Sequence, residues 1–207
     1  MSRKLLIATK NQGKMREIRD LFADLDLEIL CLRDFPDLAD VVEDGLTFRD
    51  NAAKKAQTIG LVTGLLVIGE DSGLEVDALE GRPGVYSARF AYLDQDTPPS
   101  SNAPDEANNA RLLKELNDLP LEKRAARYRC AVALADGAKL VDVVEGSCEG
   151  IIAASPQGTN GFGYDPLFII PAYQKTFGEL APSIKAKISH RAQAFRGMRE
   201  VLRRVQL

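Results

Sequence analysis

The stretch KLLIATKNQGKMREIRDLF, residues 4–22, holds the pattern that decides the fold class. Lys4 to Thr9 are mostly apolar and predict a short β-strand, and polar turn residues follow them. Ile18, Leu21 and Phe22 then recur at helical spacing. The order of strand, turn and helix is the opening unit of an α/β fold.

The same alternation continues along the chain. Residues 28–32 and 65–69 predict two more strands, and between them Thr47 could cap a helix that runs through residues 51–56. A loop rich in Pro and Ser at 94–104 separates two halves of one domain. Strands and helices therefore predict a mixed α/β fold with a long central sheet.

The second half adds a helix, a hairpin and a last helix. The spacing predicts a helix over 105–116, and alternating residues over 128–134 predict a strand. A turn signal at Asp136 leads into a second strand over 139–145, so the two strands form a hairpin. From Ser189 onward an apolar stripe predicts an amphipathic C-terminal helix.

The composition excludes several classes of protein. Of the 207 residues 45% are apolar and 28% are charged, which is typical of a globular domain. A net charge of −3 offers no positive field to a nucleic-acid polymer, and the longest apolar runs are too short to span a membrane. The three cysteines form no CxxC pair, so we expect a reducing, cytoplasmic location. Because the chain has one histidine, any metal must be held by oxygen.

Four segments carry candidate chemistry, and the first is Thr9 to Lys14. It lies where a strand ends and a helix begins, a place that favours phosphate oxygens. Gly13 allows close backbone approach, and Asn11 and Lys14 add an amide and a cation. The alternative is a polar turn with an exposed lysine.

The second segment is acidic. Glu70, Asp71 and Ser72 directly follow an apolar strand, and Glu43 lies earlier in a second acidic turn. Converging carboxylates and substrate phosphates suffice for Mg²⁺. If the strand continues there, Glu70 and Asp71 point to opposite faces, so one could hold metal while the other takes a proton. The alternative is a solvated turn with capping acids.

The third and fourth segments could recognise a base. Residues 158–166 are rich in glycine, and Phe162 or Tyr164 could stack on a planar base, unless both pack in the core. Lys185 and the run Ser189-His-Arg191 supply hydrogen-bond donors that could bind a carbonyl or a phosphate. The alternative for the single histidine is a capping or core role.

Together these segments describe what a nucleoside triphosphate and its metal require. The sequence resembles the inosine triphosphate pyrophosphatase family, the RdgB-type pyrophosphatases of non-standard purine nucleotides. The resemblance is carried by seven ordered motifs: Thr9-x-Asn11-x-x-Lys14, Glu43-x-Gly-Leu-Thr-Phe48, Asn51-Ala with Lys55, Glu70-Asp-Ser-Gly-Leu74, Pro83-Gly-Val-Tyr-Ser-Ala-Arg89, Phe162-Gly-Tyr-Asp165 and Ser189-His-Arg191.

The resemblance implies a fold, an assembly and an activity. Residues 1–207 would form a single pyrophosphatase domain, elongated, with two lobes around a long mixed sheet flanked by helices. The nucleotide would bind in the cleft between the lobes, and the protein would be a homodimer. The activity would be Mg²⁺-dependent hydrolysis of ITP, dITP or XTP to the monophosphate and pyrophosphate, which cleanses the nucleotide pool.

The resemblance also implies roles for individual residues. The phosphates and the rest of the substrate would contact Thr9, Lys10, Asn11, Gln12, Gly13, Lys14, Lys55 and Ser72. The base and sugar would contact Phe162, Gly163, Tyr164, Asp165, Lys185, His190 and Arg191. The metal would be held by Glu43 and Asp71, with Glu70 as a further ligand, and the catalytic proton acceptor would be Asp71.

These roles predict a mechanism and leave two alternatives. Water attacks the α-phosphorus, Asp71 accepts its proton, and Mg²⁺, Lys14 and Lys55 neutralise the leaving pyrophosphate. A hydrogen-bond donor beside C6 of the purine base fits the carbonyl of inosine or xanthine but not the amine of adenine. One alternative is a pyrophosphatase for other modified nucleotides, like the similarly folded Maf-type proteins. The other is a nucleotide-binding regulator without hydrolysis.

Overall fold

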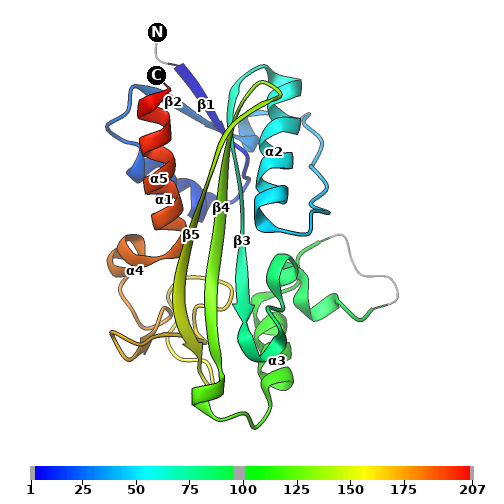
Figure 1. The fold of residues 1–207 in the computed structure, drawn as a ribbon, viewed down its shortest axis with the longest axis vertical. Coiled ribbons are helices and arrows are strands. Elements are labelled where there is room, and N and C mark those ends of the chain that lie inside the picture. Colours follow the sequence, from blue (N-terminus) through cyan, green and yellow to red (C-terminus); the bar gives the residue numbers. More distant parts are fainter. Residues whose placement is uncertain (1–2, 96–100, 206–207) are drawn as a thin grey trace. The chain divides into compact units, whose positions relative to one another are not determined.

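The computed structural model describes residues 3–95 and 101–205, which Figure 1 shows as a ribbon. The strands are β1 (Arg3–Ile7), β2 (Leu27–Cys31), β3 (Leu66–Val76), β4 (Ala125–Asp136), β5 (Lys139–Ile152), β6 (Phe168–Ile170) and β7 (Lys175–Thr176). The α-helices are α1 (Gln12–Leu21), α2 (Phe48–Thr63), α3 (Asp105–Leu116), α4 (Pro182–Ile188) and α5 (His190–Arg204). The short 3-10 helices are η1 (Leu32–Asp34), η2 (Asp77–Leu79), η3 (Gly84–Tyr92) and η4 (Leu121–Lys123).

Within the described residues the strands form one mixed sheet, in the order β2-β1-β3-β4-β5-β6-β7. β1 pairs in parallel with both β2 and β3, as strands joined by crossing helices do. β6 is antiparallel to both β5 and β7. The predicted mixed α/β class with a long central sheet is confirmed.

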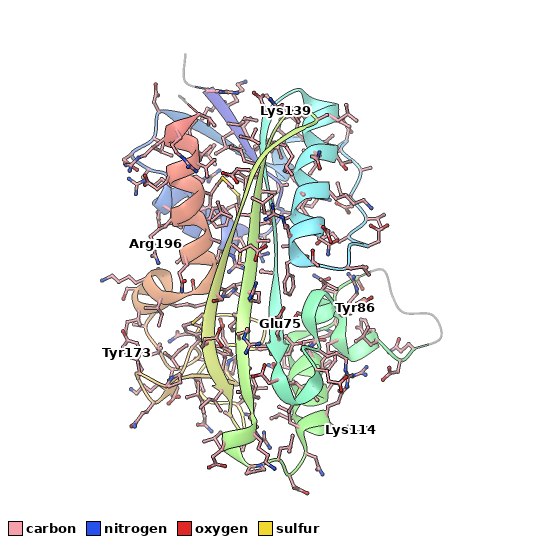
Figure 2. The ribbon with its side chains drawn as sticks, viewed as in Figure 1. Glu75, Tyr86, Lys114, Lys139, Tyr173 and Arg196 are labelled. Atoms are coloured by element: carbon pink, nitrogen blue, oxygen red, sulfur yellow. The ribbon has the colours of Figure 1, made fainter. Side chains whose placement is uncertain are left out.

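Most predicted elements are confirmed as well. α3 coincides with the helix predicted over 105–116, Thr47 caps α2, and the hairpin of β4 and β5 turns after Asp136. The C-terminal helix is amphipathic, and Figure 2 shows Arg196 on its outer side. The predicted loop at 94–104 lies partly outside the described residues. Among the described helices, none is long and apolar enough to cross a bilayer.

One strand differs from the prediction in a way that matters for function. The strand predicted over 65–69 continues to Val76. It continues because Leu74 and Val76 are fully buried again after the polar interruption. Glu70 and Asp71 therefore lie inside β3 rather than after its end, and the strand rather than a loop fixes their directions.

Internal contacts divide the chain into two compact units. The first consists of Met1–Asp71, Cys130–Gly146 and His190–Leu207, and the second consists of Ser72–Arg129 and Ser147–Ser189. β3, β4 and β5 each contribute residues to both units. That one nucleotide binds between two lobes stays a prediction.

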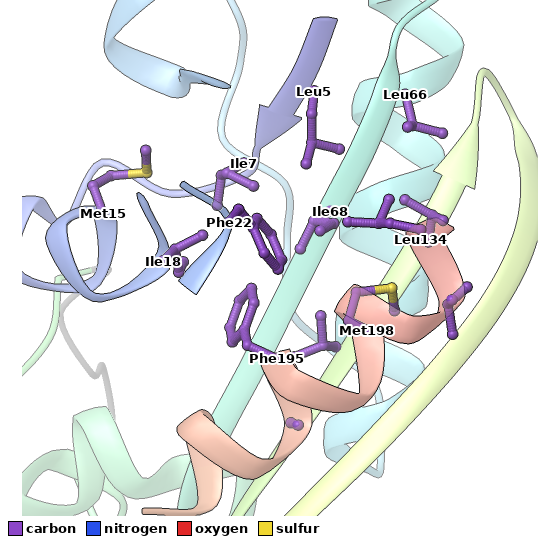
Figure 3. Close-up of a cluster of buried hydrophobic side chains, with 14 of the residues drawn as sticks. Leu5, Ile7, Met15, Ile18, Phe22, Leu66, Ile68, Leu134, Phe195 and Met198 are labelled. Atoms are coloured by element: carbon purple, nitrogen blue, oxygen red, sulfur yellow. The ribbon is translucent and has the colours of Figure 1, made fainter. Parts of the chain in front are cut away.

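The apolar core of the first unit packs α1 and α5 against β1, β3 and β4 (Figure 3). Ile18 and Phe22 of α1 and Phe195 and Met198 of α5 are buried there. Each such side chain contributes about 1.5 to 3 kcal/mol. α2 lies on the opposite face, so close to β3 that a Cβ atom on Gly69 would be 2.2 Å from a backbone oxygen of α2. Both faces of β3 are therefore covered in this unit.

The second unit has its own core, and aromatic rings dominate it. Phe168 and Phe177 stack with ring centroids 5.6 Å apart, and the Tyr128 ring lies 4.5 Å from that of Phe168. Leu74 of β3 and Leu112 of α3 are fully buried in the same cluster. Side chains from β3, β4, α3 and β6 thus hold this unit together.

Candidate active site

Most of the polar side chains with candidate functional roles gather in two places, one in each unit. The first, which we call the carboxylate cluster, consists of Lys14, Glu43, Asn51, Lys55, Glu70, Asp71 and Arg191. The second, which we call the base loop, consists of residues 161–165 with the side chains that bind them, Asp105, Asn109, Tyr128 and Lys185.

β3 presents Glu70 and Asp71 to opposite faces of the sheet, because successive side chains of a strand alternate. Glu70 shares the face of Ile68, which packs in the core with α1 and α5. Asp71 shares the face of Gly69, which lies against α2. Because β3 continues through both residues, the prediction of opposite faces is confirmed, and a division of tasks between them stays a prediction.

Glu70 is buried and bound by two cations. Its Oε1 accepts hydrogen bonds from Nε and Nη2 of Arg191, both at 3.2 Å, and its Oε2 accepts one from Lys14 Nζ at 2.5 Å. The Glu70 and Arg191 side chains are 5% and 4% exposed. A buried carboxylate is tolerable only with such pairing. Glu70 therefore fixes Lys14 and Arg191 in place.

Burial also acts on the thiol beside this ion pair. The Sγ of Cys130 lies 3.7 Å from Oε1 of Glu70. Burial, and then the negative charge of Glu70, raise the pKa of the Cys130 thiol well above its usual value. A thiol that stays protonated is neither a nucleophile nor a metal ligand.

Asp71 is tied to the loop that carries Glu43. Nδ2 of Asn51 donates to Oδ2 of Asp71 at 2.9 Å, and Oδ1 of Asn51 accepts from the backbone N–H of Gly45 at 2.7 Å. Thr47 caps α2 by accepting from a backbone N–H one turn in, which places Asn51 in the second turn. Buried Asn51 therefore orients both the Asp71 carboxyl group and the acidic loop.

Lys55 follows Asn51 on the same face of α2, four residues later. Its Nζ lies 2.9 Å from Oε1 of Glu43 and donates to the backbone oxygen of Glu70 at 3.0 Å. Its positive charge also acts on Asp71. One lysine thus acts on both Glu43 and Asp71, two of the three carboxylates that the resemblance implies as metal ligands.

The surroundings of Asp71 shift its titration. Burial raises the pKa of the Asp71 carboxyl from 3.8 to about 6, and the negative charges of Glu43 and Glu70 act in the same direction. The Asn51 hydrogen bond and the charge of Lys55 oppose this rise. A carboxyl with a pKa near the working pH is suited to accept a proton.

The donor set is compatible with a hard divalent cation. No group of three or more His, Cys, Asp or Glu side chains in the described part of the chain is arranged to hold a metal. Mg²⁺ needs fewer protein ligands, because it is usually bound by one or two carboxylates together with substrate phosphates. Glu43 and Asp71 can supply these, whereas Glu70 is occupied by Lys14 and Arg191.

The predicted phosphate segment forms the capped start of α1. Oδ1 of Asn11 accepts from the backbone N–H of Lys14 at 3.1 Å, and Oγ1 of Thr9 accepts from the backbone N–H of Asn11 at 3.1 Å. The exposed Lys10 pairs with Asp40 at 2.6 Å. Gln12 and Gly13 open the helix, and the Gln12 side chain lies outside the described part of the structure. Ser72 follows the carboxylate cluster in β3 and is half-buried.

In the second unit, Asp165 organises the base loop. Its Oδ2 accepts from the backbone N–H of Phe162 at 2.9 Å and from Lys185 Nζ, and its Oδ1 accepts from the Tyr128 hydroxyl at 3.3 Å. Gly161 has φ +80°, and a Cβ atom there would lie 1.9 Å from Oδ2 of Asp165. Glycine is thus required for the loop to close on this carboxylate.

The structure separates the two aromatic candidates. Tyr164 is buried in the core, and its hydroxyl donates to the backbone oxygen of Ser87 at 2.8 Å. Phe162 is 40% exposed, and Lys185 Nζ lies 4.6 Å from the centre of its ring. Core packing therefore accounts for Tyr164, whereas the Phe162 ring stays partly exposed.

The predicted donor cluster is divided. Lys185 contacts Asp165 in the second unit, and Arg191 contacts Glu70 in the first. His190 is buried at the start of α5, where its backbone oxygen would lie 2.3 Å from a Cβ atom on Gly146. Closeness in sequence thus does not place these donors on one group.

Sequence reasoning missed several residues of both sites. Asn51 stands in a quoted motif but received no role, and its spacing of four from Lys55 could have placed both on one helix face. Asp105 and Asn109 of α3 have the same spacing and bind the base loop. Tyr128 belongs to the strand predicted over 128–134, and that pattern does not indicate that its hydroxyl contacts Asp165.

Comparisons with known proteins show the family to which the chain belongs. A family model described as the Ham1 family matches residues 5–201. The dITP/XTP pyrophosphatase of Desulforamulus reducens is 46% identical over 204 residues, which are 99% of this chain and 98% of that protein. The structure of a HAM1 protein from Coxiella burnetii has a TM-score of 0.87 at 35% identity and covers 98% of this chain and 99% of its own. The crystal structure of a nucleoside-triphosphatase / dITP/XTP pyrophosphatase from Mycobacterium abscessus has a TM-score of 0.76 at 39% identity. The match covers 96% of this chain and 99% of that chain.

The fold and the carboxylate cluster define an α/β protein with the charged groups that phosphoryl transfer requires. The chain belongs to the Ham1 family. The resemblance to the inosine triphosphate pyrophosphatase family, inferred from the seven motifs, is therefore confirmed.

Proposed function

We propose that this protein is a dITP/XTP pyrophosphatase. It hydrolyses non-standard purine nucleoside triphosphates, ITP among them, to the monophosphate and pyrophosphate. Similarity over nearly the full length to proteins of that name supports the activity. The single structural observation that carries the proposal is the carboxylate cluster, in which the half-buried Asp71, with a pKa of about 6, lies near Glu43 and Lys55.

Asp71 acts as the proton acceptor in this proposal. Water attacks the α-phosphorus of the nucleotide and gives its proton to the Asp71 carboxylate. Asn51 holds Oδ2 of Asp71 in one orientation. Lys14 and Lys55 neutralise the charge of the leaving pyrophosphate, and Glu70 positions Lys14 for this task.

Glu43 and Asp71 would hold Mg²⁺ together with the substrate phosphates. The bound ion supplies charge neutralisation at the phosphate oxygens. We propose a positioning role for Glu70, which the sequence also predicts as a metal ligand, because both of its oxygens are bound by cations.

The base loop binds the purine in this proposal. Phe162 stacks on the base, an interaction worth roughly 1 to 3 kcal/mol. Lys185 lies beside the ring of Phe162. Its ammonium group can only donate hydrogen bonds, which suits the C6 carbonyl of inosine or xanthine and not the C6 amine of adenine. A homodimer and a cytoplasmic location stay predictions.

A substrate panel tests the proposal. About a dozen nucleoside triphosphates are incubated with the protein, with Mg²⁺ or with a chelator, and monophosphate and pyrophosphate are quantified. We expect equal amounts of both products from ITP, dITP and XTP, only with Mg²⁺, and a kcat/KM for ATP lower by about 10²-fold or more. Release of orthophosphate, or equal turnover of ATP and ITP, would contradict the proposal. Nucleotide binding without turnover would instead favour a regulator.

A further inference from the structure

We propose that Asp105 and Asn109 of α3 are positioning residues that hold the base loop in its binding conformation. Neither residue touches the reacting atoms; both act through Gly163, the neighbour of Phe162. The inference rests on the proposed function, because it assigns a consequence for nucleotide binding to contacts that are seen in the second unit.

The two residues bind both polar backbone groups of one glycine. Oδ2 of Asp105 accepts from the N–H of Gly163 at 2.6 Å, and Nδ2 of Asn109 donates to the oxygen of Gly163 at 3.1 Å. Because they are four residues apart on a helix, both side chains project from the same face of α3. One helix face therefore fixes the peptide groups on either side of Gly163.

The backbone of Gly163 depends on these hydrogen bonds more than the backbone of most residues would. Its φ is +63°, in the left-handed region, and nothing lies within 4 Å of the place where a Cβ atom would be. Packing therefore does not hold this residue, and glycine loses more conformational freedom on ordering than any other residue. The hydrogen bonds to α3 supply the constraint that packing does not.

Together with Asp165, these contacts fix the backbone on both sides of the Phe162 ring. The N–H of Phe162 donates to Asp165 Oδ2 at 2.9 Å, and its oxygen accepts from the N–H of Asp165 at 3.3 Å. The ring is still 40% exposed. An exposed ring on a fully bonded backbone is organised before a ligand arrives, so less ordering opposes binding.

The burial of Asn109 indicates that its position serves the loop. Its side chain is buried, yet its Oδ1 has no hydrogen-bond partner among the described residues. A buried acceptor without a partner destabilises a fold, so such a group in a native structure requires an explanation. The donor on the same amide explains it, because Nδ2 must face Gly163 and Oδ1 is thereby turned away.

The test compares a ligand that has a base with one that lacks it. KM and kcat are measured for ITP, and inorganic tripolyphosphate serves as a competitive inhibitor that has phosphates only. For the double variant Asp105→Ala/Asn109→Ala we expect KM for ITP to rise about 10- to 30-fold, with kcat within about threefold. The inhibition constant of tripolyphosphate should stay within about twofold, because the carboxylate cluster is unaltered.

Two further variants serve as controls. Asp105→Asn retains an acceptor for the Gly163 N–H and should reverse most of the rise in KM that Asp105→Ala causes. Glu106→Ala removes a carboxylate from the same first turn of α3, where the side chain is exposed, and should leave KM unchanged.

The outcomes separate the inference from the proposed function. A KM that does not change in the double variant would overturn the inference alone, provided that the wild-type protein hydrolyses ITP. If KM, kcat and the tripolyphosphate constant all change together, the role of the two residues is general stability, and the inference is again wrong. A wild-type protein without turnover would overturn the proposed function and this inference with it.

Discussion

The carboxylate cluster and the base loop differ in what holds their side chains in place. Glu70 and Asp71 project from a strand that is covered on both faces, and Asn51 and Lys55 project from a long helix. Phe162 projects from a loop, and side-chain to backbone hydrogen bonds from Asp165 fix that loop. Apart from Glu43, which lies on a loop, the charged groups of the carboxylate cluster thus belong to regular elements, while the ring that would meet a ligand belongs to a loop.

Because the two sites differ in this way, substitutions in them should affect different kinetic constants. Changes in the carboxylate cluster should act on kcat, because charge develops there only in the transition state. Changes in the base loop should act on KM, because stacking is equally present in the ground state and the transition state.

The largest effect is expected for Asp71→Asn. Loss of the proton acceptor should lower kcat by about 10² to 10⁴-fold, measured with saturating ITP and Mg²⁺. Because burial raises the Asp71 pKa to about 6, ionised Asp71 is less favourable in the folded state than in the unfolded chain. At pH 8 in the absence of metal, the variant should therefore be more stable to denaturant, by up to about 3 kcal/mol. A variant that is inactive because it is unfolded would contradict this prediction.

Removal of the buried charge on the other face of β3 should have the opposite effect on stability. Glu70→Gln leaves Arg191 and Lys14 without their carboxylate partner, and loss of one member of a buried ion pair destabilises by about 3 to 5 kcal/mol. Urea unfolding of the variant and of Glu200→Gln provides the measurement. Glu200 pairs with Arg203 at the surface, so its loss should cost at most about 1 kcal/mol. Equal losses of stability in the two variants would contradict the conclusion that Glu70 forms a buried ion pair with Arg191 and Lys14.

In the base loop, Phe162→Ala should raise KM for ITP by roughly 5- to 150-fold, the equivalent of 1 to 3 kcal/mol of stacking. Its kcat should change by less than about threefold. Phe162→Trp keeps a stacking surface and should retain a KM near that of the wild type. A fall in kcat without a change in KM would remove the distinction between the two sites.

The smallest effect concerns pH. For the free enzyme, kcat/KM should fall about tenfold per pH unit below pH 6 and level off above about pH 7, because only ionised Asp71 accepts a proton. The titration of Asp71 affects stability in the opposite direction: a rise in pH increases activity but lowers the free energy of unfolding. Its pKa is higher in the folded state, so its contribution to stability is complete below pH 3.8 and is lost as the pH rises through about 6. A pH profile of kcat/KM that is flat from 5 to 8 would exclude Asp71 as the acceptor.

The fold could be predicted from sequence largely because its elements are regular. The periodicity of 105–116 gave α3 with the correct ends, and Thr47 marked the start of α2. The extent of β3 could not be predicted, because Glu70 and Asp71 interrupt its apolar pattern. Only their distant partners, Arg191 and Asn51 among them, make the buried Glu70 and the half-buried Asp71 compatible with a strand.

The members of the carboxylate cluster other than Asn51 were predicted, but their contacts were not. Motifs identified Glu43, Lys55 and Asp71, whereas the grouping of Arg191 with Glu70 depends on packing of α5 on the sheet. Exposure, which the sequence does not encode locally, was needed to choose Phe162 over Tyr164.

Hydrolysis in water labelled with ¹⁸O tests the central claim most directly. The α-phosphorus joins the nucleoside, which the base loop would hold, to the pyrophosphate, which the cations of the carboxylate cluster would neutralise. If water attacks that atom, a single turnover of ITP places the label in the monophosphate and leaves the pyrophosphate unlabelled. Label in the pyrophosphate, or in released orthophosphate, would contradict the account.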